Sequence, residues 1–94
     1  MSKTLRIGMI GAGFIGRAHV YGYTTMAMIF PDASAHPVLE LLAEATPDLA
    51  ATSAKRLGFR RHTSDWRSLV ADKDVDIVDI CVPSILNRDR KSVV

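Results

Sequence analysis

The feature that most constrains this chain is a short apolar segment, Arg6 to Ile10, that leads directly into Gly11-Ala12-Gly13-Phe14-Ile15-Gly16. A strand followed by G-x-G-x-x-G places bare backbone amides at the start of a helix, where an anionic group binds. Gly11 permits a sharp turn, Gly13 permits close approach of a pyrophosphate, and Gly16 permits tight packing of the helix on the strand. The pattern predicts a dinucleotide-binding turn; the alternative is a glycine-rich turn that only packs.

The rest of the chain alternates apolar strands with helices, in the order βαβαβαβ. The strands are continuously apolar rather than alternating, which is typical of a parallel sheet with helices on both faces. We therefore expect an α/β fold with about four strands of a doubly wound sheet. The expected strands are residues 5–10, 38–43, 59–62 and 75–82, and residues 32–37 are expected to form a loop. The first expected helix spans 14–30, and the second runs from Thr46-Pro47-Asp48 to Gly58. The third follows a cap at Thr63 or Ser64, and its expected buried face carries Trp66, Leu69 and Val70.

Size and composition limit the class of protein. The chain has 94 residues, of which 48% are hydrophobic, so it is one small domain or a piece of a larger one. Residues 88–91 carry the whole net charge of +2, and no basic stripe precedes them, so nucleic-acid binding is not expected. No apolar run is long enough to span a membrane. The single cysteine, Cys81, suits a reducing cytoplasm.

An acid at the end of the second strand of a dinucleotide-binding unit hydrogen-bonds the adenosine ribose. Glu44 holds that place, whereas Glu40 falls inside the strand and Asp48 inside the next helix. A carboxylate repels a 2′-phosphate and no arginine follows immediately, so NAD is favoured over NADP. The alternative is that Glu44 is only a solvated strand end.

The end of the fourth strand is a second candidate contact. Val82-Pro83 lies at the expected switch point of the sheet, where ligands bind outside the strand carboxyl ends, although Pro83 could simply stop the strand. No catalytic residue is predicted. The three histidines lack metal-ligand spacing, so no metal site is predicted. Asp79 interrupts an apolar strand and needs a partner that the sequence does not identify.

Together these segments resemble the opening of the Gfo/Idh/MocA oxidoreductases, the group of glucose–fructose oxidoreductase and inositol dehydrogenase. The resemblance runs from residue 5 to about residue 83 and is more specific than the glycines alone. The matching motifs are IGMIGAGFIGRAH at 7–19, AEATPD at 43–48, AKRLGF at 54–59, TSDW at 63–66 with LV at 69–70, and DVDIVDICVP at 74–83.

The resemblance implies the N-terminal part of a Rossmann domain from an NAD(P)-dependent dehydrogenase. Such enzymes often act on sugars, cyclitols or related polyols held by a second domain. By position, the glycine turn would bind the pyrophosphate, Glu44 the ribose, and the end of the fourth strand the nicotinamide half. The implied cofactor-binding residues are Gly11, Ala12, Gly13, Phe14, Ile15, Gly16, Glu44, Val82 and Pro83.

The chain also departs from the family pattern. After the strand-ending proline the family usually has Asn and, three residues on, His, where this chain has Ser84 and Asn87. The family's Glu-Lys-Pro motif, with its catalytic lysine, and the substrate domain do not occur in this sequence. The fragment is therefore expected to bind a dinucleotide weakly and not to catalyse.

We interpret residues 1–87 as a partial NAD(P)-binding domain and residues 88–94 as a non-native polar tail. Asp89 to Val94 can be back-translated into a common sequencing adapter read in one frame; the alternative is a natural or engineered truncation. A fourth strand without its covering helix leaves an apolar sheet edge, so self-association through that edge is expected.

Two other functions fit the same residues. One is a non-catalytic module that senses NAD(H). The other is a methyltransferase or flavin-binding domain, which can share a glycine turn and a strand-end acid. Titration with NADH, flavin and S-adenosylmethionine would discriminate among them.

Overall fold

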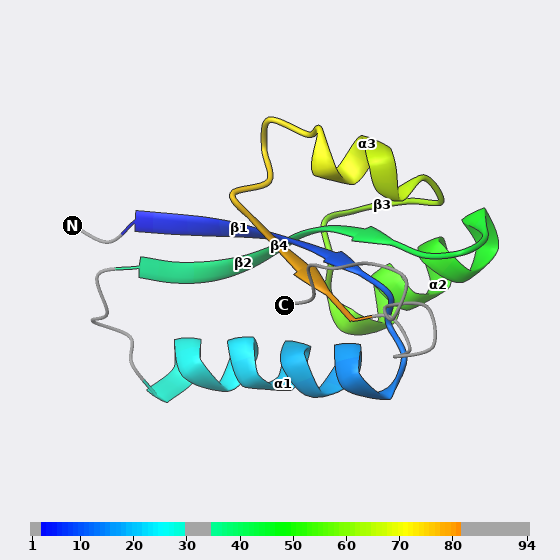
Figure 1. Ribbon diagram of the computed structural model, residues 1–94. Helices are drawn as coiled ribbons and strands as arrows, with labels where there is room; N and C mark the ends of the chain where they lie inside the picture. The colour runs from blue at the N-terminus through cyan, green and yellow to red at the C-terminus, as the bar shows by residue number, and fades with distance from the viewer. Residues whose placement is uncertain (1–2, 30–34, 82–94) are drawn as a thin grey trace.

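A computed structural model shows a parallel four-stranded sheet between two helical layers (Figure 1). The structure describes residues 3–29 and 35–81. The strand order is β3-β2-β1-β4, and this arrangement confirms the expected α/β fold. The elements are β1 (Lys3–Ile10), α1 (Phe14–Ile29), β2 (Ala35–Ala43), α2 (Pro47–Leu57), β3 (Arg61–Thr63), α3 (Trp66–Val70) and β4 (Ile77–Ile80).

The helices cover both faces of the sheet because each contributes apolar side chains to one of two cores. On one face, Val20 of α1 and Ala54 of α2 pack with Met9 and Leu42 of the two central strands. On the other face, Leu69 of α3 is fully buried among side chains of β1, β2 and β4. In Figure 1, α1 accordingly lies below the sheet and α3 above it.

The carboxyl ends of β1 and β2 meet at one end of the sheet, where α1 begins (Figure 1). β4 pairs with β1 from Ile7 to Ile10, so its last residues reach the same end. This arrangement brings the glycine turn, the residue after β2 and the end of β4 together, as a doubly wound sheet requires.

Local signals placed the second helix correctly. The Thr46 side chain accepts a hydrogen bond of 3.2 Å from the Leu49 N–H, so Thr46 caps α2 as expected. Gly58 ends the helix with a left-handed φ of 91°. Of the three expected core residues of α2, Ala50 and Ala54 are buried and Leu57 is half-buried.

Each of the four strands differs from its sequence prediction. β1 begins at Lys3 rather than at residue 5. β2 begins at Ala35, so residues 35–37, expected in a loop, belong to the strand. Because β3 pairs with β2 only from Leu41 onward, none of the described strands lies beside Pro37 on that side of β2, and a missing N–H is tolerated there. β3 spans Arg61–Thr63 rather than 59–62, and Phe59 is a buried core residue before it. β4 is shorter than the expected 75–82.

The third helix is also capped differently. Asp65, rather than Thr63 or Ser64, is the N-cap of α3, and its carboxylate accepts a hydrogen bond of 3.0 Å from the Arg67 N–H. Only Leu69 of the expected buried face is buried, because the helix has just five residues. Trp66 is 40% exposed, with the Arg67 guanidinium 4.8 Å from its ring centroid.

No helix among the described residues has the length and apolar character needed to cross a membrane.

Candidate functional site

The glycine turn connects β1 to α1 with a geometry that depends on two of its glycines. Gly11 has a φ of 94°, which L side chains rarely adopt, and its N–H donates a hydrogen bond of 2.9 Å to the Ala43 carbonyl of β2. A Cβ on Gly16 would lie 2.5 Å from the Gly11 carbonyl oxygen. Gly16 therefore lets α1 start directly against the turn.

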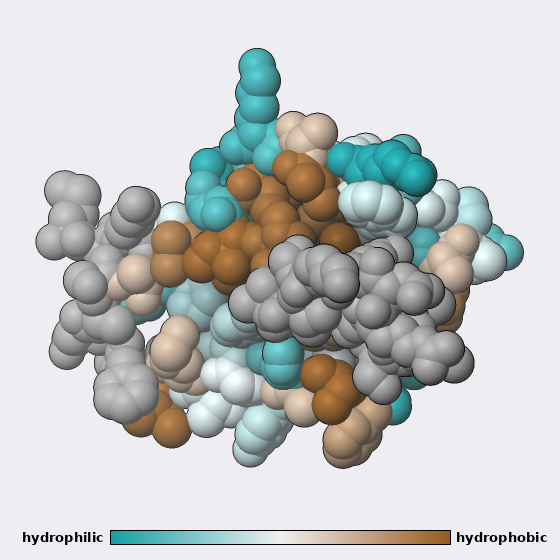
Figure 2. Space-filling model, in the orientation of Figure 1, coloured by the Kyte–Doolittle hydropathy of each residue, from teal (hydrophilic) through white to brown (hydrophobic). Residues whose placement is uncertain are grey.

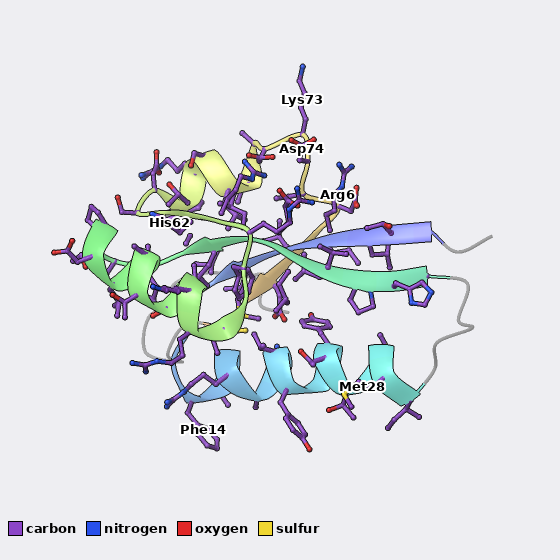
Figure 3. All side chains as sticks on the ribbon, turned by 180° about the vertical axis from the view of Figure 1, so that it is seen from behind. Arg6, Phe14, Met28, His62, Lys73 and Asp74 are labelled. Atoms are coloured by element: carbon purple, nitrogen blue, oxygen red, sulfur yellow. The ribbon has the colours of Figure 1, made fainter. Side chains whose placement is uncertain are left out.

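The middle of the turn faces open space. A Cβ added to Gly13 would meet no atom within 4 Å, so the main chain is accessible there. The first amides of a helix have no carbonyl partner within it, and no acidic side chain occupies the first turn of α1. Phe14 is 77% exposed and its side chain points away from the sheet (Figure 3). The side chain therefore leaves the main chain of the turn uncovered. This cradle fits an anion at the helix N-terminus.

Glu44 directly follows β2 and reaches across to the turn. Its Oε2 accepts a hydrogen bond of 2.7 Å from the Ala12 N–H, and its own N–H donates to the Thr63 carbonyl at 3.0 Å. A carboxylate has about four lone-pair sites. The contact with Ala12 therefore leaves acceptor capacity for the hydroxyl groups of a ligand.

A hollow of about 250 Å³ adjoins this carboxylate. It lies between the turn, the first part of α1 and one face of α2, so it combines an apolar wall with polar and cationic groups. Its lining residues are Ala12, Gly13, Arg17, Glu44, Leu49, Ser53, Arg56 and Leu57.

The structure brings most of the predicted site residues together. The glycine turn and Glu44 form one contiguous site, joined by the hydrogen bond from Ala12. Val82 and Pro83, predicted to face the nicotinamide half, lie outside the described residues. The ligand contacts of all these residues remain predictions.

Sequence reasoning missed the contribution of α2 and of Arg17. Leu49, Ser53 and Arg56 line the hollow and follow one another at i, i+4 and i+7, which places them on one helix face. That spacing after the strand-end acid is the signal that could have identified them. Two arginines thus share a hollow with Glu44, although none follows it directly in sequence.

The structure also identifies the partners of Asp79. Its Oδ2 accepts hydrogen bonds of 2.7 Å from His19 Nδ1 and from the Tyr23 hydroxyl. The Cys81 thiol donates to Oδ1 at 3.2 Å. Burial opposes ionisation of Asp79, but hydrogen bonds from Tyr23, His19 and Cys81 hold the pKa of its carboxyl below the ordinary value. Burial, and then the hydrogen bond to Asp79, raises the pKa of the Tyr23 hydroxyl.

His19, Asp79 and Cys81 also include donor types that bind metals, and their ligand atoms lie within 4.8 Å of one another. Ligands of tetrahedral zinc lie roughly 3.3–3.8 Å apart, given its bond lengths. The separation of 2.7 Å between His19 Nδ1 and Asp79 Oδ2 is shorter than this range and is that of a hydrogen bond.

A parallel sheet in this order, a glycine turn at its switch point and an acid after the second strand define a Rossmann dinucleotide-binding domain. Comparison with known proteins supports the same class of domain. The chain belongs to the Gfo/Idh/MocA family: the family profile, described as "Oxidoreductase family, NAD-binding Rossmann fold", matches residues 5–92.

Three relatives are informative. Levoglucosan dehydrogenase of Pseudarthrobacter phenanthrenivorans is 47% identical over 93% of this chain and 22% of its own length. A structure of levoglucosan dehydrogenase with NADH and levoglucosan is 47% identical, with a TM-score of 0.85 over 93% of this chain and 24% of the other. The structure of an NAD-binding oxidoreductase of Klebsiella pneumoniae is 44% identical, with a TM-score of 0.83 over 85% of this chain and 21% of the other.

The chain therefore corresponds to the NAD-binding part of a Gfo/Idh/MocA oxidoreductase. It spans about 22% of the length of the curated relatives that it matches.

Proposed function

We propose that this chain supplies the cofactor-binding residues of an NAD-dependent dehydrogenase that acts on a sugar, cyclitol or related polyol. The main chain of residues 11–16 would hold the pyrophosphate, Glu44 the adenosine ribose, and Val82 with Pro83 the nicotinamide side. When bound, NAD supplies a hydride acceptor, and NADH a hydride donor. Residues 1–87 form the domain in this proposal, and residues 88–94 are a polar tail.

One observation carries the proposal: the Glu44 carboxylate lies 2.7 Å from the Ala12 N–H, and both residues line the hollow beside the turn. A dinucleotide carries a ribose diol next to a pyrophosphate. The carboxylate is suited to bind the diol, and the adjacent N-terminus of α1 is suited to bind the pyrophosphate. The hollow between the turn, α1 and α2 has a volume of about 250 Å³, and Leu49 and Leu57 of α2 form its apolar wall.

Preference for NAD over NADP follows from charge. The Glu44 carboxylate repels a 2′-phosphate, whereas Arg17 and Arg56 of the same hollow attract it. Glu44 is held by a hydrogen bond at the ribose position, so we expect its repulsion to dominate.

The sugar or polyol substrate is proposed by analogy with the relatives, since levoglucosan dehydrogenase is a sugar-acting enzyme by its name. Because the chain spans about 22% of that relative, we propose that it binds the cofactor without turning over substrate by itself.

Titration calorimetry of this chain with NADH, NADPH, flavin adenine dinucleotide and S-adenosylmethionine tests the proposal. We expect NADH to bind most tightly. In Glu44→Gln, which keeps the shape and removes the charge, NADH affinity falls about 10-fold and the preference over NADPH narrows. Asp48→Asn, the same change at an exposed acid of α2, leaves both affinities unchanged.

Tighter binding of flavin or S-adenosylmethionine would indicate one of the other nucleotide-binding functions. Equal effects of Glu44→Gln and Asp48→Asn would remove Glu44 from the ribose site.

We further propose that the chain self-associates through β4. This strand is the edge of the sheet in the described residues, and its Ile77 is 41% exposed. Figure 2 shows apolar side chains gathered where Figure 1 draws the first part of β4 and the neighbouring part of β1. The single, buried Cys81 supports a cytoplasmic location.

A further inference from the structure

A polar cluster around the buried Asp79 connects α1 to β4, and we call it the Asp79 cluster. It consists of His19 and Tyr23 on α1 with Asp79 and Cys81 at the end of β4. Asp79 is only 8% exposed, and each of its oxygens accepts at least one hydrogen bond within the cluster. The carboxylate is therefore buried in a fully hydrogen-bonded setting.

The geometry of the cluster depends on both elements. His19 and Tyr23 are one helical turn apart, so both face the sheet side of α1, and both donate to the same Oδ2 at 2.7 Å. Asp79 and Cys81 are two residues apart and share one face of the strand, where Cys81 joins the core with Val20. A single carboxylate oxygen thus fixes two points along α1 relative to β4.

Packing alone does not require this arrangement. Apolar side chains of similar volume are often as stabilising as a buried charged group. What a carboxylate with directed hydrogen bonds adds is a defined position along and around the helix axis. The cost of burying Asp79 therefore points to a requirement for precise placement of α1.

The two elements joined by the cluster carry different halves of the cofactor site. α1 begins at the glycine turn five residues before His19, and the Cys81 N–H donates a hydrogen bond of 2.8 Å to the Ile10 carbonyl beside that turn. Residue 82, proposed to face the nicotinamide, directly follows Cys81. The position of α1 against β4 therefore sets the separation between the two halves.

We propose that Asp79 is a positioning residue for the dinucleotide: through His19 and Tyr23 it fixes the pyrophosphate-binding end of α1 relative to the end of β4. This inference rests on the proposed function. A ligand that spans both elements needs the correct separation. A ligand confined to the Glu44 side does not need it.

The test compares the affinities of the chain for NADH and for AMP, measured by titration calorimetry. Asp79→Asn should lower the affinity for NADH about 10-fold and the affinity for AMP less than about 2-fold. The reason is that AMP lacks the nicotinamide half, which approaches β4. Asp74→Asn is the matched control at an acid whose side chain is 63% exposed, beside Arg6 (Figure 3), and it should change neither affinity.

Variants at His19 and Tyr23 keep the proposal testable if Asp79→Asn does not fold. His19→Asn retains an N–H at the position of Nδ1 and should preserve NADH affinity, whereas His19→Leu should weaken it about 10-fold. Tyr23→Phe, which removes only the hydroxyl, should also raise the ratio of NADH to AMP dissociation constants.

Three outcomes would overturn the inference. An unchanged NADH-to-AMP ratio in Asp79→Asn would leave Asp79 without a positioning role, as would equal affinities in His19→Asn and His19→Leu. Parallel losses of both affinities together with the thermal midpoint would indicate a structural role only. If the unmodified chain binds neither ligand, the proposed function fails first, and this result is distinct because it requires no variant.

Discussion

Arg61 of β3 donates a hydrogen bond of 2.8 Å from Nε to Oε2 of Glu40 in β2, and the Glu40 side chain is only 8% exposed. The same guanidinium donates two further hydrogen bonds, of 2.9 and 3.1 Å, to the Asp72 carboxylate after α3. One arginine thus joins two strands and the turn that follows α3. The bidentate pair has the planar geometry in which arginine binds carboxylates most strongly.

Arg61→Gln should destabilise the chain by about 2 kcal/mol, because it leaves the buried Glu40 carboxylate without its closest cationic partner. Urea denaturation at neutral pH measures the change. Arg60→Gln is the control: Arg60 is 70% exposed and lies 3.7 Å from Glu40, so its loss should cost less than about 0.5 kcal/mol. Equal losses for the two variants would contradict the assignment.

The order of elements and the glycine turn could be predicted because their signals lie within a few neighbouring residues. Thr46, Pro47 and Gly58 mark the ends of one helix by their own backbone preferences. Glu44 was identified in the same way, since it directly follows an apolar strand.

The side-chain pairs could not be predicted, because they depend on how distant elements pack. His19 and Asp79 are 60 residues apart, and Glu40 and Arg61 are 21 apart. No pattern of neighbouring residues marks either of these two pairs in the sequence. The start of β2 at Ala35 could not be predicted for a related reason. Pro37 is tolerated within the strand because β3 does not extend beside it, and this depends on how the strands pair.

The stability of the chain should decrease in acid through Asp72. Hydrogen bonds from Arg61, and then from the Asp74 N–H, hold the pKa of the Asp72 carboxyl below its ordinary value. Its contribution is fully present above the unfolded-state pKa of about 4 and is lost as pH falls through the lower folded-state pKa. In Asp72→Asn, the urea midpoint should therefore be lower at about pH 6 but should converge on that of the unmodified chain in acid.

Asp48→Asn controls for the general effect of removing one acid, because Asp48 is exposed. Asp48 lies in the first turn of α2, where a carboxylate interacts favourably with the helix dipole, so its loss should lower the midpoint at about pH 6 by less than the loss of Asp72. A constant difference between Asp72→Asn and the unmodified chain across the pH range would rule out this titration.

The Cys81 thiol should react slowly. It is 6% exposed, and burial, followed by the hydrogen bond to Asp79, raises its pKa to about 12, so the reactive thiolate is scarce at neutral pH. A disulfide reagent at about pH 8 should modify the folded chain about 100-fold more slowly than the chain unfolded in urea. Similar rates in the two states would contradict the burial of this thiol.

Three glycine-to-alanine variants should separate folding from cofactor binding. At Gly16, a Cβ would lie 2.5 Å from the Gly11 carbonyl oxygen, so Gly16→Ala should lower both the thermal midpoint and NADH affinity. At Gly13, a Cβ meets no protein atom within 4 Å. Gly13→Ala should therefore retain its thermal midpoint but lose at least about 10-fold in NADH affinity, by blocking the approach of the pyrophosphate.

Gly22→Ala is the control within the same helix. A Cβ there also meets nothing within 4 Å, and alanine is a better helix former than glycine by about 1 kcal/mol. The thermal midpoint should rise and NADH affinity should stay unchanged. If Gly13→Ala and Gly22→Ala had the same effect on NADH affinity, the turn would not be the pyrophosphate site.

Self-association should depend on the exposed edge of β4. Ile77 pairs with Ile7 on one side, and among the described strands none pairs on its other side. Ile77→Lys places a charge on this edge, which is how natural sheets resist edge pairing, and should shift the sedimentation profile toward the monomer. Val70→Lys introduces the same charge at a 54% exposed apolar residue of α3, away from the edge, and should leave the profile unchanged. Equal shifts would mean that general charge, rather than the β4 edge, controls association.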